Sequence, residues 1–481
     1  MIHTALEKRL LRGCLCMSIK SKGFLRELFE IDVHERWKIF FLSVTFFLII
    51  GAYTVTRDLK SAIFMSVVGR TYVPWAKYAS MFILVPLILF YSALVDHMRR
   101  YQLLALCCFV FGIASLIFTF LLGHPEIGIS NTQPSPWRMF GWFFYFFVEG
   151  YTPFVVSVFW AFANSISSPE SAKKNYGFIV SGSKIGGMFS AGLAWLMFSI
   201  SSKNSSIFSD VMMHQVIMGV SSLMLLCVPF VLWMLMRKVP GHLLHGYEAA
   251  YQVEKHKDKT GHADTGMFAG LKMFFKYPYV LGIFGMVFFY EVTSTILSYL
   301  RLGIAEANAQ SVSDVSKILF EIMFKTHAIG LLISLFGTRM LHEKLGTRNC
   351  LMLIPLLTGA FLLYLMIETT PEALVNAFVA FKAIHYAFSW PVRESLYIPT
   401  VKEIKFKSKS WIDAFGSKFA RGAGSTFNIV ASVSGSALLL PLHSFFFAGL
   451  IVFWFITSFL LGRRFDRAVV RNEVIGSEEY S

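Results

Sequence analysis

Several charged residues stand inside long apolar runs of the sequence, where a charge is costly. The candidates for a binding site are Lys60, Glu149, Lys184, Glu291, Lys382, Lys418 and Arg421. At the centre of a membrane helix a charge costs about 2.5–3.5 kcal/mol, so such residues usually face a cavity and pair or bind a ligand. Lysine as a point charge and arginine as a planar fork both suit phosphate. Because cations outnumber carboxylates in this set, it predicts a cavity for an anion with several negative charges.

The same residues allow other interpretations, which the sequence leaves open. Each charged residue could form a structural ion pair between helices. The glycines beside Lys184 and Arg421 would let a ligand approach the backbone, or they could serve close helix packing. Tyr145, Trp160 and Tyr290 could stack on a nucleotide base. In a chain with 16% aromatic residues, however, an aromatic side chain more often belongs to the core.

Other chemistries lack their motifs. The sequence has no Walker motif, and so does not predict an ATP-driven pump, and it has no Rossmann fingerprint or nucleophile elbow. Cys14 and Cys16 have no second pair with which to complete a zinc site. We therefore expect no enzymatic activity, no cofactor and no bound metal.

The elements that must position the charged residues are transmembrane helices. Of the 481 residues, 55% are apolar and 15% charged, whereas about 25% are charged in soluble domains. One soluble core could not bury so much apolar surface. Runs of roughly 20 apolar residues mark membrane helices. They predict twelve spans, at 38–60, 74–95, 101–123, 138–165, 174–199, 212–236, 277–300, 317–338, 349–367, 372–395, 411–435 and 440–462.

The distribution of Lys and Arg predicts the orientation. These residues gather before the first span, in the loop between the sixth and seventh spans and after the last span. By the positive-inside rule both termini are cytoplasmic. The formal charge of +15 is thus mainly a topology signal, and we expect no nucleic-acid partner. The predicted organisation is a basic segment at 1–37, a half at 38–236, a linker at 237–276, a second half at 277–462 and a tail at 463–481.

An internal repeat relates the two halves. Gly182-Ser183-Lys184 recurs as Gly416-Ser417-Lys418 after 234 residues, and the same offset from Glu149 leads to a position beside Lys382. Chance in an apolar chain is the alternative. Two six-helix halves with a substrate site between them at the midplane are typical of secondary transporters. We therefore predict an all-α membrane protein with twelve transmembrane helices in two six-helix pseudo-repeats, like the major facilitator fold.

Four stretches in chain order carry a further resemblance. They read Arg57-Asp58-Leu59-Lys60, Phe159-Trp160-Ala161-Phe162-Ala163-Asn164, Tyr290-Glu291-Val292-Thr293 and Trp411-Ile412-Asp413. They resemble Arg-Asp-Thr-Lys, Phe-Trp-Gly-Phe-Ala-Asn, Glu-Val-Thr and the loop before the eleventh span of nucleotide transporters. These transporters form the ATP/ADP translocase family of obligate intracellular bacteria and plastids.

The resemblance implies roles for individual residues. In that family one lysine and two glutamates that match Lys60, Glu149 and Glu291 are required for transport. Arg421 matches a family lysine in a Gly-Lys-Ser-Gly-Gly stretch, and Lys184 stands where the family tends to have asparagine. Ser294-Thr295 replaces a Trp-Lys pair. These departures leave the substrate and the coupling mode open.

The resulting expectation is a transporter that exchanges ATP for ADP by alternating access. The five cations of the candidate set would bind phosphates, while Glu149 and Glu291 would pair with them in the empty cavity. A proton-coupled symporter, with Glu149 or Glu291 as the proton carrier, is the main alternative. NAD or a sugar phosphate as the substrate, a membrane scaffold or receptor without transport, and an embedded enzyme are the others.

The location follows from this expectation. Importing ATP is useful where the surroundings contain it, which indicates the inner membrane of a bacterium living inside a host cell. The basic N-terminal segment resembles neither a cleavable signal nor a plastid transit segment. Residues 1–16 could precede the native start, because Met17 is an alternative initiator. We expect a multi-pass monomer in the lipid bilayer.

Overall fold

The computed structural model describes helices at every predicted span. It describes residues 35–84, 98–167, 169–203, 209–240, 276–336, 338–397, 399–400, 404, 408–433, 436–471 and 473–476. Most of the predicted linker at 237–276, nearly all of the N-terminal segment and part of the second span lie outside the described residues. The prediction of an all-helical membrane fold is confirmed.

The N-terminal half begins with a long helix, α2, and consists of antiparallel helices. Its elements are α2 (Arg36–Val67), the turn η1 (Arg70–Tyr72), a helix at 73–84, α4 (Arg100–Leu122), α5 (Met139–Tyr151), η2 (Thr152–Val156), α6 (Ser157–Ser165), α7 (Pro169–Lys203) and α8 (Asp210–Lys238). The run α5–η2–α6 forms the fourth span.

The C-terminal half repeats this plan. Its elements are α12 (Pro278–Ala307), α13 (Val312–Phe336), α14 (Thr338–Ile367), α15 (Pro371–Ile384), η3 (His385–Ser389), α16 (Trp390–Ser395), α17 (Lys409–Trp411), η5 (Ile412–Gly416), α18 (Ser417–Val433) and α19 (Ser436–Val470). Within α14 the backbone kinks at Gly346, whose φ of 73° lies in a region that glycine enters without strain.

Eight of the described helices are long and apolar enough to cross a membrane by themselves. The remaining predicted spans each have a local reason to fall short. Only residues 73–84 of the second span are described, and α13 carries Asp314, Lys317, Glu321 and Lys325. α15 ends at a π-helical turn after 14 residues, and α18 has 17 residues. The spans that are too short or too polar are therefore largely those whose apolar runs are interrupted by charged or irregular segments.

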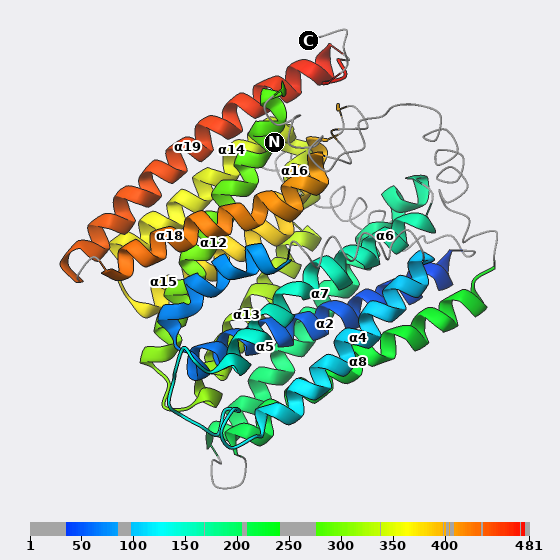
Figure 1. The fold of residues 1–481 in the computed structure, drawn as a ribbon. Coiled ribbons are helices and arrows are strands. Elements are labelled where there is room, and N and C mark those ends of the chain that lie inside the picture. Colours follow the sequence, from blue (N-terminus) through cyan, green and yellow to red (C-terminus); the bar gives the residue numbers. More distant parts are fainter. Residues whose placement is uncertain are drawn as a thin grey trace, which may run out of the picture.

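The two halves lie side by side and pack through α7, α13 and α2 (Figure 1). α2, α4 and α8 form one flank, and α14, α18 and α19 form the other, with α19 along the outer edge. One apolar cluster includes residues of both halves, among them Leu59, Phe198 and Phe320. A second cluster, around Phe46 and Phe159, lies within the N-terminal half.

Irregular turns interrupt three helices near the candidate charged residues. The π-helical turns η2, η3 and η5 each have five residues. Glu149 lies three residues before η2, and Lys382 lies three residues before η3, at equivalent places in the fourth helix of each half. Single π-helical turns often mark functional sites. The matching turns support the predicted repeat at the level of the backbone.

Candidate anion-binding site

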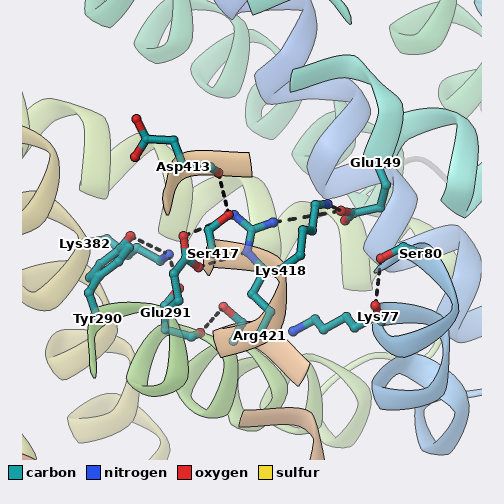
Figure 2. Close-up of polar contacts among 12 residues, drawn as sticks. Lys77, Ser80, Glu149, Tyr290, Glu291, Lys382, Asp413, Ser417, Lys418 and Arg421 are labelled. Atoms are coloured by element: carbon teal, nitrogen blue, oxygen red, sulfur yellow. Dashed lines mark hydrogen bonds and ion pairs between the residues drawn. The ribbon is translucent and has the colours of Figure 1, made fainter. Parts of the chain in front are cut away.

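Glu149 is the centre of a cluster of charges between the two halves. One carboxylate oxygen accepts a hydrogen bond from Lys60 Nζ of α2 at 2.6 Å. The other accepts one from Lys418 Nζ of α18 at 2.6 Å (Figure 2). Because Lys60 belongs to the N-terminal half and Lys418 to the C-terminal half, the carboxylate joins the halves. Its side chain is only 12% exposed, so both pairs are shielded from solvent.

Arg421 extends the cluster to the second glutamate. Its Nε and Nη2 donate to the two oxygens of Glu291 at 2.9 and 3.2 Å, which is a bidentate pair. Its Nη1 also lies 3.9 Å from a Glu149 oxygen. Arg421 follows Lys418 by three residues on α18, which puts the two cations on the same helix face. The fork of Arg421 thus connects both carboxylates.

Lys382 has no carboxylate within ion-pair distance among the described residues. Its ammonium donates to the Tyr290 hydroxyl at 3.1 Å and to Ser294 Oγ at 2.5 Å. It also lies 5.3 Å from the centre of the Tyr290 ring, within the range of a cation–π contact. These neutral partners hold the amine but leave its charge uncompensated. Lys382 therefore contributes net positive charge beside Glu291.

Lys184 lies apart from this cluster. Its ammonium is 3.4 Å from the backbone carbonyl of Tyr386, in the π-helical turn η3. α7 and η3 belong to different halves, so the contact bridges them. Its predicted role as a phosphate ligand stays a prediction, because in this conformation it contacts a neutral carbonyl and not the carboxylates of the cluster.

The three predicted stacking residues are already engaged in this conformation. The Tyr145 ring lies beneath Lys60, whose Nζ is 4.3 Å from the ring centre. Tyr290 stacks on Phe381 and on His385, at 5.2 and 3.3 Å between ring centres. Trp160 packs edge-on against Phe46 and Phe159 in the apolar cluster of the N-terminal half. Tyr145 and Tyr290 thus support cations of the cluster, and Trp160 belongs to a core.

The glycines beside the cations serve helix packing. A side-chain carbon on Gly182 would meet the Ser43 carbonyl at 2.8 Å, and one on Gly186 would meet that of Phe47. On α18, a side-chain carbon on Gly424 would lie 3.0 Å from the Val292 carbonyl. The alternative of backbone approach by a ligand is not what these glycines provide here, because neighbouring helices fill the space.

Further polar contacts join the halves where α2 and α12 end. Arg301 donates to Asp58 at 2.9 Å, Arg70 pairs with Glu306 at 2.7 Å, and His214 is 2.9 Å from Ser316 Oγ. Asp58 is 1% exposed and also contacts Arg57 at 3.3 Å. These contacts tie the halves together on one side of the cluster.

Some residues of the cluster escaped the sequence analysis. Ser294 was noted there as a departure from the family pattern, whereas it is a partner of Lys382. Lys77, on the helix at 73–84, points toward Arg421 (Figure 2). It stands near the predicted start of a span, where a lysine usually reaches the membrane surface. Its sequence position alone therefore gave no sign of a buried role.

The fold resembles solved transporters. A D-xylose–proton symporter aligns with a TM-score of 0.62 at 13% identity, over 89% of this chain and 97% of that one. The xylose transporter XylE of E. coli in an inward-open conformation aligns with a TM-score of 0.57 at 12% identity, over 88% and 94%. At this identity the likeness concerns the fold alone.

Sequence comparison identifies the family. ADP,ATP carrier protein 1 of Chlamydia pneumoniae is 22% identical over 96% of this chain and 98% of its own length. ADP,ATP carrier protein 2 of Arabidopsis thaliana chloroplasts is 23% identical, over 93% and 78%. The model of the TLC ATP/ADP transporter family matches residues 17–465. Since this match covers nearly the whole chain, the protein belongs to the TLC ATP/ADP transporter family.

Proposed function

We propose that this protein exchanges ATP for ADP across a membrane by alternating access. The observation that carries the proposal is the cluster of Lys60, Lys382, Lys418 and Arg421 around two carboxylates, at the contact between the halves. Its relatives include carriers named for ADP and ATP in bacteria and chloroplasts. A phosphate chain is the part of both nucleotides that such a surplus of positive charge recognises best.

Substrate binding exchanges partners within the cluster. Phosphate oxygens replace the Glu149 oxygen at Lys418, 2.6 Å away in the empty site, and the Glu291 oxygens at Arg421. Lys418 and Arg421 then keep a charge-assisted hydrogen bond, and Glu149 keeps its pair with Lys60, whereas Glu291 gives up its pair with Arg421. The link across the halves passes from Glu149 to the substrate. The halves can then move with the nucleotide held between them.

The same exchange of partners accounts for obligatory counter-transport. Without a nucleotide, reorientation would have to separate Lys418 from Glu149, and breaking a buried pair costs about 3–5 kcal/mol. A bound nucleotide supplies replacement partners and removes that cost. An empty carrier therefore does not reorient until another nucleotide binds. A ligand shifts such an equilibrium only through a difference in affinity between the states.

The proposed orientation has both termini in the cytoplasm of a bacterium, in its inner membrane. It rests on the concentration of Lys and Arg before the first span and in the loop at 237–276. The end of the molecule where Asp58 contacts Arg301 then faces the outside. In this conformation the halves are in contact at that end through Asp58 with Arg301 and through Arg70 with Glu306.

Uptake of labelled ATP by intact E. coli expressing this protein tests the proposal. Saturable uptake, followed by release of label only when unlabelled ADP is added outside, is the expected result. The Lys418→Gln variant should lose most uptake, and Lys238→Gln, at an exposed residue of α8, should keep it. Uptake that collapses when the proton gradient is dissipated would indicate proton symport and contradict exchange. Failure to take up ATP, with the protein present in the membrane, would overturn the substrate assignment.

A further inference from the structure

Lys77 lies beside the candidate site on an element that the other charged residues do not use. It belongs to the helix at 73–84, which contacts α18 through Tyr78. The next residue, Tyr78, is hydrogen-bonded to Thr426, and its ring lies 3.4 Å from the position of a side-chain carbon on Gly422. The half-buried side chain of Lys77 extends from this helix toward Arg421 of α18 (Figure 2).

The ammonium group of Lys77 is unpaired among the residues that the structure describes. Ser80 Oγ donates a hydrogen bond to the backbone carbonyl of Lys77 at 2.7 Å, and no side chain or carbonyl among the described residues accepts one from its ammonium. Lys60, Arg421 and Lys382 repel its ammonium and Glu149 attracts it. A cation held among cations without its own carboxylate is costly in a low-dielectric site, unless an anion joins it.

We propose that Lys77 is a substrate-binding residue whose free ammonium group binds a phosphate of the nucleotide. The inference rests on the proposed function and adds a fifth cationic side chain to a cluster with two carboxylates. With all five side chains protonated, the cluster has three more positive than negative charges, which suits a chain of two or three phosphates better than a single one.

Lys77 differs from Lys418 and Arg421 in what its removal changes. Neutralising Lys418 removes one of the two lysine partners of Glu149, and neutralising Arg421 removes the bidentate partner of Glu291. Lys77 holds no carboxylate, so neutralising it removes a phosphate contact and leaves the ion pairs intact. The effect should therefore appear in the affinity for the substrate and not in the maximal rate. It should also be larger for the more highly charged ATP than for ADP.

Binding of inorganic pyrophosphate to the purified full-length protein tests Lys77 without requiring transport. We expect Lys77→Gln to bind about tenfold more weakly, the loss of one charge-assisted hydrogen bond. Lys77→Arg should restore most of the affinity, and Lys238→Gln should bind like the unchanged protein. Equal affinities for Lys77→Gln and the unchanged protein would overturn the proposal. Thermal-shift titration measures the affinity and reports folding at the same time.

Chemical protection gives a second test on the unchanged sequence, in case Lys77→Gln does not fold. Acetic anhydride labels accessible amines, and peptide mass spectrometry reports the labelling of each lysine. Pyrophosphate should protect Lys77 while labelling of Lys238 stays constant. Labelling of Lys77 that pyrophosphate leaves unchanged would contradict its role.

Transport kinetics separate this inference from the function on which it rests. In cells, Lys77→Gln should raise KM about tenfold for ATP, less for ADP, and leave the maximal rate within twofold. A maximal rate that falls with KM unchanged would overturn the binding role. If the unchanged protein takes up no nucleotide although Lys77 governs pyrophosphate binding, the nucleotide assignment fails and the anion site stands.

Discussion

At the scale of single residues, the chemistry of the site lies in carboxylates that are shared. Glu149 serves Lys60 and Lys418, and Arg421 reaches both Glu149 and Glu291. A shared carboxylate keeps several cations close together in the absence of substrate. It is also easy to displace from any one of them, because it retains the others. This arrangement keeps Lys60, Lys418 and Arg421 paired until an anion binds.

Substitutions of Arg421 distinguish a need for positive charge at this position from a need for the planar guanidinium group. Arg421→Lys keeps the charge but replaces the bidentate pair with Glu291 by a single contact, so one charge-assisted hydrogen bond is lost. We expect ATP uptake to fall about tenfold, equivalent to about 1.4 kcal/mol. Arg421→Gln should abolish uptake. The measurement is the initial rate of ATP uptake, normalised to the amount of protein in the membrane. Equal rates for the two variants would contradict a role for the charge of Arg421.

The Glu149 pairs predict an asymmetry in stability. Glu149→Gln leaves both Lys60 and Lys418 without their buried partner, whereas Lys418→Gln leaves Glu149 paired with Lys60. Loss of one partner of a buried pair costs about 3–5 kcal/mol. Glu149→Gln should therefore lower the melting temperature in detergent more than Lys418→Gln does. Pyrophosphate should partly restore Glu149→Gln, because it supplies the missing negative charge. The reverse order of melting temperatures would refute the shared-carboxylate account.

At the scale of elements, close contact between α2 and α7 holds the N-terminal half together. A methyl group on Gly186 would collide with the carbonyl of Phe47, and the backbone of α2 cannot yield as a side chain could. Overpacking of this kind costs about 1–3 kcal/mol. Gly186→Ala should lower the melting temperature by several degrees. Gly219→Ala on α8 is the matched control and should have little effect, because the added side-chain carbon would meet no atom of a neighbouring element within 4 Å.

Hydropathy and family resemblance predict the helices and most of the charged residues of the cluster. They do not predict which of these residues form ion pairs. Apolar runs located the helices because a membrane demands them, and charges within the runs located Glu149, Glu291, Lys418 and Arg421. Which of these charges pair depends on helix rotation and on the π-helical turns, which no run of apolar residues encodes. Lys184 is an example. It occupies the same place in the Gly-Ser-Lys repeat as Lys418, but its ammonium contacts the Tyr386 carbonyl of η3 and not a carboxylate.

At the scale of the whole molecule, the structure is held closed where α2 and α12 end. There Asp58 accepts hydrogen bonds from Arg301 of the other half and from Arg57 of its own. The pair of Arg70 and Glu306 lies farther out, with side chains 32% and 49% exposed. Exposed pairs contribute about 0–1 kcal/mol, and breaking a buried pair costs several times more. Asp58 is therefore the residue on which closure at this end depends most.

Asp58→Asn should open the end that this residue holds closed. The substitution leaves the buried Arg301 without its carboxylate in the closed state, whereas in an open state water would solvate the arginine. A cysteine introduced at the buried Ala305 of α12 reports the opening. We expect an impermeant thiol reagent, added to intact cells, to label Ala305→Cys faster when Asp58→Asn is present. The native cysteines would first be replaced. Glu306→Gln is the control, since its exposed pair adds little to closure. If Asp58→Asn leaves the labelling rate unchanged, this pair does not hold the halves together, and the apolar packing of Leu59, Phe198 and Phe320 must do so instead.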